Sequence, residues 1–360
     1  MQFIRPALLA TTILTASMTT AFADVKVVTS IKPVHSLVAA VMQGVGTPDL
    51  IVEGAGSPHT YALKPSQAKQ LQEADLVFWM SHDLEAFLEK SIDGIATKAV
   101  SVPLMESRGL MTLGFREGGA FDDHGHDEHD DHDDHDDHEK HDKDGDHDHD
   151  KHDDHDENEK HDKDDDHDHE KHDDHDDHEK HNEHDHGEVD PHVWLDPENA
   201  KAMVHEIEEA LAKADPANAA TYESNAEAVM AKLDSLVAEI DSELQPVKGR
   251  GYIVFHDAYQ YFENRFGVSA IGSITVSPEV LPGAERISDL QEKVRSLDAT
   301  CVFSEPQFEP KLVATVTENT NARFGVIDPL GAAIDEGPNL YFTLIRNMAS
   351  SLKNCLLGSG

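Results

Sequence analysis

The segment from Asp122 to Glu188 constrains the fold most, because it contains only Asp, Glu, His, Lys, Asn and Gly. Its 35 acidic residues against 7 Lys give a net charge of −28, out of −43 for the whole chain. A segment without apolar side chains cannot offset the conformational entropy lost on folding, so we expect it to be disordered without a ligand. The chain must therefore build its hydrophobic cores from the residues on either side.

This segment also holds 20 of the 26 histidines and an internal repeat, in which residues 139–158 and 159–178 are identical at 16 of 20 positions. Imidazoles interleaved with carboxylates predict several weak, exchangeable metal sites, open to Cu²⁺, Ni²⁺ and Co²⁺ as well as Zn²⁺. The alternative is a solvating loop produced by repeat expansion, whose metal affinity has no use. The accessory ligands that we predict are His124, His126, His129, His132, His135, His138, His147, His149, His152, His155, His167, His169, His172, His175 and His178.

The charge excludes one class of partner. A nucleic-acid-binding protein needs a basic surface to displace the counterions of phosphates, and this chain is strongly acidic. We therefore expect no nucleic acid and predict metal ions as partners.

The N-terminus resembles a secretory signal peptide, with Arg5, an apolar stretch and a small-x-small end at residues 21–23. We expect cleavage after Ala23 and a periplasmic protein. No window reaches the ~18 apolar residues of a membrane-spanning helix.

Two cysteines, Cys301 and Cys355, are the only ones in the chain. In an oxidising compartment such a pair favours a disulfide, whereas in the cytosol both would be buried thiols. We expect the disulfide to attach the last helix to a core strand.

On both sides of the acidic segment, short apolar runs alternate with amphipathic helical patterns, which is typical of parallel α/β sheets with crossover helices. Strands are expected at 25–30, 50–52, 76–80 and 100–103, then at 252–255, 301–305 and 324–328. We predict an α/β fold of two lobes, each a small parallel sheet with flanking helices, joined by one long rigid helix with a ligand site in the cleft. The expected divisions are a signal peptide (1–23), an N-terminal lobe (24–118), a disordered metal-binding loop (119–188), the remainder of that lobe (189–214), the connecting helix (215–246) and a C-terminal lobe (247–360).

Three of the six histidines outside the acidic segment stand where a strand or irregular segment gives way to a turn or helix. They are His59, His192 and His256. Asp328 has the equivalent place at the end of the run FGVID. Three imidazoles with a carboxylate suit tetrahedral Zn²⁺, so these four residues are the predicted metal ligands.

The other three histidines have simpler interpretations. His205 lies among acidic residues on a predicted helix, as a solvated surface residue would. His82 is better explained as a neighbour of a helix cap than as a ligand. His35, in the first turn after a strand, is a candidate for supporting the site indirectly.

Several motifs together resemble a known family: GSPHTYALKPSQ, VDPHVWLDP, FHDAYQYFENRFG, PEVLPGAERISDL, CVFSEPQF and VIDPLG. They are similar to the periplasmic zinc-binding proteins of ATP-binding-cassette zinc importers, within the group that binds zinc or manganese. The resemblance covers essentially the whole mature chain. It implies a Zn²⁺ ion held between two lobes and delivered to a transmembrane permease.

The resemblance also implies a set of ligands. The family's metal-binding histidines fall on His59, His192 and His256, and its acidic fourth position falls on Asp328. Some zinc-binding members carry Glu immediately before the first His, and Pro58 stands there in this chain. The fourth position therefore belongs to Asp328 or to a water.

Two other functions stay open at this point. One is a free-standing periplasmic zinc buffer or chaperone, because a permease-docking surface leaves no short motif. The other is a zinc hydrolase, since three protein ligands and an open position also describe catalytic zinc. Against the hydrolase, no HExxH occurs, and Asp257 is the only obvious candidate for a base. We expect a monomer without enzymatic activity.

Overall fold

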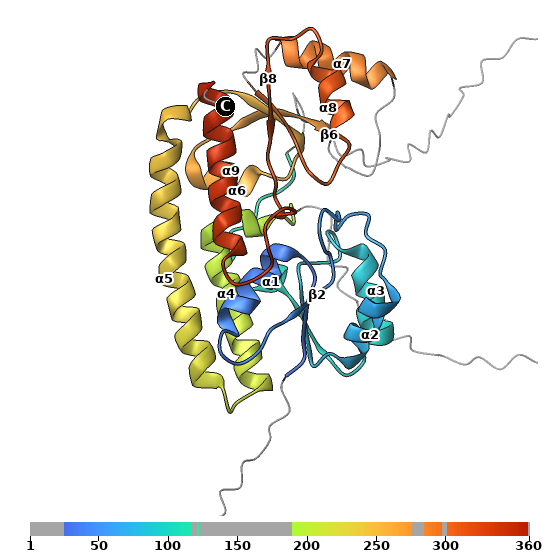
Figure 1. Cartoon of the computed structure of the whole chain (residues 1–360), viewed down its shortest axis with the longest axis vertical. Helices are drawn as coiled ribbons and strands as arrows, with labels where there is room; N and C mark the ends of the chain where they lie inside the picture. Colours follow the sequence, from blue (N-terminus) through green and yellow to red (C-terminus); the bar gives the residue numbers. More distant parts are fainter. Residues whose placement is uncertain (1–24, 117–120, 122–188, 276–283, 297–300, 359–360) are drawn as a thin grey trace, which may run out of the picture. The chain divides into compact units, whose positions relative to one another are not determined.

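The computed structural model describes residues 25–116, 121, 189–275, 284–296 and 301–358, all within the same compact unit of the chain (Figure 1). The predicted signal peptide and the segment 122–188 lie outside these residues.

Two parallel sheets form the framework, as predicted, and each has four strands. In the first sheet the strand order is β2-β1-β3-β4. β1 and β3 occupy its centre, and all their side chains are buried, which explains why both strands are mainly apolar. The bounds are β1 Val27–Thr29, β2 Asp49–Leu50, β3 Leu76–Trp79 and β4 Val100–Pro103.

The second sheet repeats this arrangement in the order β6-β5-β7-β8. Three of its strands match predicted runs, but β6 was not predicted. The sequence of β6, AIGSIT, contains Gly and Ser and has no strong apolar pattern. The segment forms a strand because it pairs with β5. The bounds are β5 Tyr252–His256, β6 Ala270–Thr275, β7 Cys301–Ser304 and β8 Arg323–Val326.

Helices lie between and after the strands, as the alternating sequence pattern predicts. They are α1 Lys32–Val41, α2 Pro65–Glu73, α3 Ala86–Ile95, α4 Pro197–Ala214, α5 Ala219–Leu244, α6 Gln260–Phe266, α7 Ala284–Ser296, α8 Pro310–Thr317 and α9 Leu340–Leu357. The 3₁₀ turns are η1 Leu104–Glu106, η2 Val193–Leu195 and η3 Gln245–Val247.

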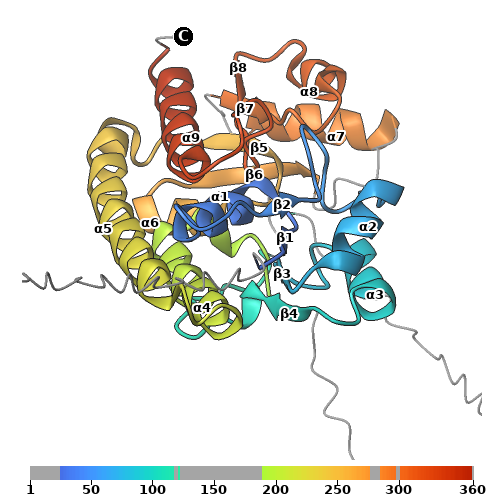
Figure 2. The ribbon, with the colours of Figure 1, turned by 60° about the horizontal axis from the view of Figure 1, so that its bottom comes forward.

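The long helix α5 buries apolar side chains at helical spacing, from Tyr222 through Leu233 to Leu244. With 26 residues it extends for about 39 Å. It packs against α1 and α4 beside the first sheet and leads through η3 into β5 of the second (Figures 1 and 2). The predicted connecting helix is therefore present.

A second helix, α9, lies beside α5 and also contacts both halves (Figure 1). Near its start the Tyr341 backbone N–H donates to Ser36 Oγ in α1, and near its end Cys355 forms a disulfide with Cys301 in β7. The predicted disulfide and its attachment of the last helix to a core strand are thus confirmed. The sequence did not reveal that α9 also reaches the first half.

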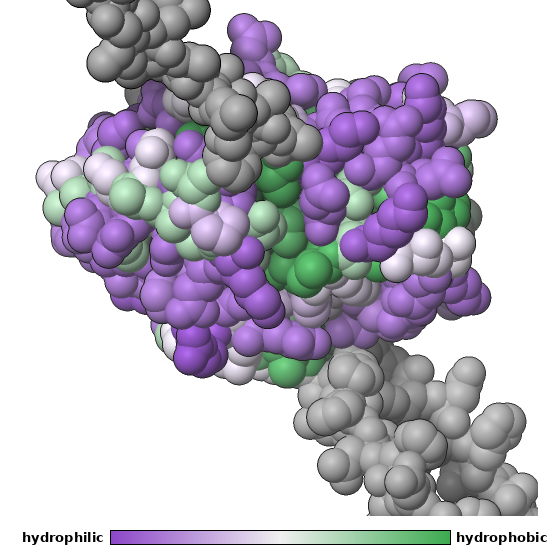
Figure 3. All heavy atoms as spheres, turned by 90° about the horizontal axis from the view of Figure 1, so that it is seen from below, coloured by the Kyte–Doolittle hydropathy of each residue, from purple (hydrophilic) through white to green (hydrophobic). Residues whose placement is uncertain are grey.

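Among the described residues, no helix is long and apolar enough to span a bilayer. Seen from below, the protein is mainly hydrophilic, with hydrophobic atoms gathered in a strip between polar flanks (Figure 3).

Candidate metal centre

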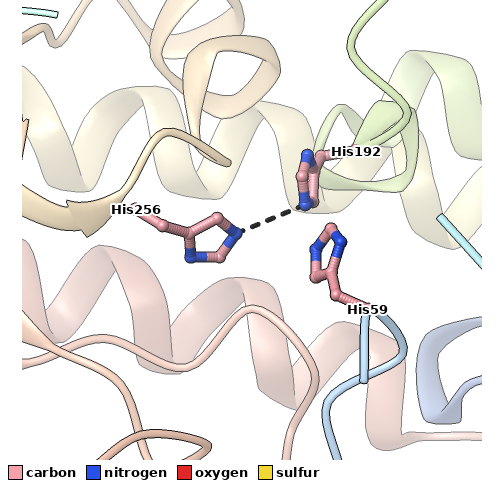
Figure 4. Close-up of side chains that lie close together, drawn as sticks. All are labelled: His59, His192 and His256. Atoms are coloured by element: carbon pink, nitrogen blue, oxygen red, sulfur yellow. Dashed lines mark hydrogen bonds between the residues drawn. The ribbon is translucent and has the colours of Figure 1, made fainter. Parts of the chain in front are cut away.

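Three histidines from distant parts of the chain converge at one point (Figure 4). His59 lies in the irregular segment after β2, His192 directly precedes η2, and His256 is the last residue of β5. Each can offer one ring nitrogen such that the three atoms lie within 4.8 Å of one another. The structure thus brings together the three histidines that the sequence singled out.

The spacing of two of these nitrogens fits zinc. His192 Nε2 and His256 Nε2 lie 3.4 Å apart. Two nitrogens bound tetrahedrally to the same zinc ion, each ~2.05 Å from it, are about 3.3 Å apart. The ring of His59 completes the group, with its centroid 5.6 Å from that of His192 and 5.8 Å from that of His256.

The protonation of His59 favours metal binding. Burial lowers the pKa of His59 well below its ordinary value, and the neighbouring His192 and His256 lower it further. The ring is therefore neutral at pH 7 and keeps the lone pair that a metal needs.

His256 has a different environment. Burial acts to lower the pKa of His256, but the carboxylates of Glu305, Asp257 and Asp190 together outweigh this effect and raise it. A positive charge at this position is therefore favoured, and a bound divalent cation satisfies the same preference.

Two carboxylates contact the histidines on the side away from the centre. Asp190 Oδ1 lies 2.6 Å from His192 Nδ1, and Glu305 Oε1 lies 2.7 Å from His256 Nδ1. The sequence interpretation assigned no role to either residue. The available signals were an acid two residues before His192 and an acid directly after the strand CVFS.

Asp328 is not part of this group. Its Oδ1 accepts hydrogen bonds from Gln307 Nε2 and from the backbone N–H groups of Leu330 and Gly331, and its Oδ2 accepts from that of Ala332. The carboxylate thus stabilises the turn after β8. That turn supplies Pro329 and Leu330 to the wall of the pocket that contains the three histidines.

The remaining described histidines lie elsewhere. His205 is exposed on α4 near Glu208 and Glu209, as expected for a surface residue. His82 pairs with Glu89 at 2.7 Å and is half exposed. His35 is buried, with Nε2 3.2 Å from the carbonyl oxygen of Pro48. The predicted accessory histidines lie outside the described residues.

Asp257, the candidate base of a hydrolase, is engaged elsewhere. Both of its carboxylate oxygens accept hydrogen bonds from the Arg116 guanidinium, which also contacts Glu263 at 2.6 Å. Asp257 therefore has a structural role as the hydrogen-bond partner of Arg116.

The chain is similar to known zinc-uptake proteins. A family model described as "ZnuA: Zinc-uptake complex component A periplasmic" matches residues 27–355. The high-affinity zinc uptake system protein ZnuA of Brucella abortus (strain 2308) is 56% identical over 330 residues, covering 92% of this chain and 91% of that protein.

Two solved structures share the fold. One, described as "Crystal structure of ZnuA", has a TM-score of 0.65 at 20% identity and covers 92% of this chain and 99% of its own. The other is a ZnuA deletion mutant with zinc bound, with a TM-score of 0.63 at 20% identity, covering 92% and 98% respectively.

Proposed function

Because this chain belongs to the family of periplasmic zinc-uptake components, we propose that His59, His192 and His256 bind the Zn²⁺ ion that it delivers for import. The family's role is capture and transport of zinc, and its members are not enzymes. The observation that carries the site assignment is the convergence of three imidazole nitrogens, two of them at tetrahedral spacing.

The donor set also argues for zinc over manganese. Imidazole nitrogen suits Zn²⁺, whereas Mn²⁺ favours a larger share of carboxylate, carbonyl and water oxygens. A cluster of three histidines is therefore a poor match for Mn²⁺. We expect Zn²⁺ to displace Mn²⁺ from the loaded protein in a direct competition experiment.

For the fourth ligand we propose a water. The Asp328 carboxylate already accepts four hydrogen bonds, three of them from the backbone of the turn after β8, and ligating a metal would require breaking part of this set. We expect Asp328→Asn to change zinc affinity by only a few-fold. A loss as large as that of His256→Ala would instead identify Asp328 as a ligand.

For the acidic segment we propose the role of an accessory zinc collector or sensor. The support is its 20 histidines and its net charge of −28. A solvating loop without such a role is the competing explanation.

Zinc competition titration with stoichiometry, at pH 7.5, tests both assignments. It compares the mature protein with a variant in which a short Gly/Ser linker replaces residues 122–186. One tight site is expected to survive the replacement while only weaker sites vanish. Loss of tight binding would show that the acidic segment itself is the principal site.

After zinc binding, we propose that the protein delivers the ion to an ATP-binding-cassette permease. We also propose that it acts as a monomer. A zinc buffer without a permease would not stimulate transport. The test is zinc uptake by membrane vesicles containing the permease, with and without the zinc-loaded protein, together with sedimentation of the loaded protein. No added uptake would favour the buffer.

Export through cleavage after Ala23 is likewise proposed. The support is the sequence pattern at residues 1–23 and the periplasmic character of the family. The mass of the mature protein isolated from the periplasm is the direct check, and a mass that includes residues 1–23 would exclude cleavage.

A further inference from the structure

Two of the three clustered histidines are each paired with a buried carboxylate through the ring nitrogen that faces away from the centre. The distances are 2.6 Å from His192 Nδ1 to Asp190 and 2.7 Å from His256 Nδ1 to Glu305. All four residues are at most 5% exposed. When Nδ1–H donates to a carboxylate, the neutral ring carries its lone pair on Nε2. These are the nitrogens that lie 3.4 Å apart in the cluster (Figure 4).

Asp190 is itself firmly held. Its Oδ1 also accepts from the backbone N–H of His192, and its Oδ2 accepts from Gln260 Nε2 at 2.6 Å. The hydroxyl of Tyr261 donates to the backbone carbonyl of Asp190 at 2.8 Å. Gln260 and Tyr261 belong to α6, which follows β5. The orientation of His192 therefore depends on the same strand–helix unit that carries His256.

Glu305 reaches His256 through the topology of the second sheet. β5 and β7 are neighbouring parallel strands, and β5 ends at His256 while Glu305 directly follows β7. Since parallel strands end at the same edge, the two side chains meet there. Glu305 also lines the pocket that contains the three histidines.

We propose that Asp190 and Glu305 are positioning residues for zinc binding, which hold His192 and His256 with Nε2 directed at the metal, and that Gln260 fixes Asp190. This proposal rests on the proposed function, in which these two imidazoles bind the transported zinc. It predicts that both rings are oriented before the metal arrives. The competing explanation is that each carboxylate serves only to pair a buried imidazole and so supports the fold alone.

The experiment compares Glu305→Gln, Glu305→Ala and Asp190→Asn in the full mature chain. Zinc affinity is measured by chelator competition, ligand geometry by the visible absorption of bound Co²⁺, and folding by the thermal midpoint of the metal-free protein. Loss of a partner that orients a metal-binding histidine typically weakens metal binding by about 10- to 100-fold. We expect Glu305→Gln and Asp190→Asn to fall in this range with an altered Co²⁺ spectrum.

Comparing Glu305→Gln with Glu305→Ala distinguishes an effect on the orientation of His256 from an effect on folding. The amide oxygen of Gln can still accept from His256 Nδ1–H, so Glu305→Gln should retain more affinity than Glu305→Ala. The thermal midpoint of the metal-free protein should stay near that of the wild type in Glu305→Gln. If both variants lower the midpoint but keep wild-type zinc affinity and Co²⁺ spectrum, the carboxylate only supports the fold and the proposal fails.

Two further variants distinguish failure of the positioning proposal from failure of the site assignment. Glu85→Gln is a matched control, because Glu85 is a buried carboxylate that accepts from the backbone N–H groups of Met80 and Ser81. It should bind zinc like the wild type, and an equal loss there would overturn the proposal. His256→Ala tests the site itself. If His256→Ala keeps tight binding, the site assignment is wrong; if it loses binding while the changes at 190 and 305 have no effect, only the positioning proposal is wrong.

Discussion

At the scale of single residues, the first sheet also carries a buried carboxylate after one of its strands. Glu85 lies beyond the end of β3, is fully buried and accepts hydrogen bonds from the Met80 and Ser81 backbone. Burial raises the pKa of Glu85 from 4.5 to about 7, although these hydrogen bonds act to lower it. Near neutral pH this side chain therefore carries a proton about half of the time.

The raised pKa predicts a pH-dependent stability. A carboxyl group whose pKa is higher in the folded state contributes stability that is complete below about pH 4.5 and is lost as pH rises through about 7. The loss from this group above pH 7 is roughly 3 kcal/mol. Glu85→Gln does not titrate, so its unfolding free energy relative to that of the wild type should increase by about this amount between pH 5 and pH 8.

Urea unfolding of the two metal-free proteins at several pH values measures this difference. Because both proteins share every other titrating group, the comparison isolates position 85. A constant difference from pH 5 to pH 8 would mean that Glu85 is ionised in the folded protein throughout.

At the scale of elements, the disulfide joins the end of α9 to the start of β7. Cys301 is the first residue of β7, and Glu305 follows its last residue. At ~3.3 Å per residue the disulfide lies about 13 Å along the strand from Glu305. Stability and metal binding should therefore respond differently to its removal.

The double variant Cys301→Ala, Cys355→Ala is predicted to lose stability without losing the metal site. A loop of 54 residues corresponds to about 4 kcal/mol on the chain-entropy model. Denaturant unfolding should show a loss of this order, while zinc affinity changes by less than a few-fold. A large fall in affinity with unchanged stability would contradict the assignment of the disulfide to the fold.

The acidic segment gives a second prediction at this scale. Metal and protons compete for imidazole, whose ordinary pKa is about 6.5, so zinc bound by the segment should dissociate as pH falls through about 6 to 6.5. Stoichiometry of the mature protein at pH 7.5 and at pH 5, with the linker variant as the control, measures this. Undiminished occupancy of the segment at pH 5 would show that its sites do not depend on neutral imidazole.

At the scale of the whole molecule, charge is concentrated unevenly. The segment 122–188 carries −28 of the −43, so the rest of the chain carries −15. A large negative field attracts divalent cations over a Debye length, which is about 30 Å at 0.01 M salt and about 3 Å at 1 M.

This concentration of charge predicts faster zinc capture at low salt. In stopped-flow mixing at 0.01 M salt, the mature protein should bind zinc at its central site faster than the linker variant does. The ratio of the two rates should approach one at 1 M salt, where screening removes the attraction. A ratio that does not change with salt would exclude electrostatic collection.

Much of the fold was predictable because its determinants are local. Buried parallel strands such as β3 and β7 are continuous apolar runs, and α5 has apolar residues at helical spacing without Gly or Pro. β6 was missed because its strand character comes from pairing with β5, which no local pattern records.

The candidate site also has a part that local sequence predicts and a part that depends on the tertiary structure. The sequence by itself predicted that His59, His192 and His256 lie together, since each stands where a strand or irregular segment gives way to a turn or helix, and a parallel sheet presents side chains to a ligand at such positions. Only the tertiary structure decided their partners, because strand order is not written in the spacing of residues. β7 lies between β5 and β8, so Glu305 ends up beside His256, whereas the strand preceding Asp328 is two strand spacings, roughly 10 Å, from β5. That order makes Glu305 a neighbour of the three-histidine cluster and leaves Asp328 to stabilise a turn.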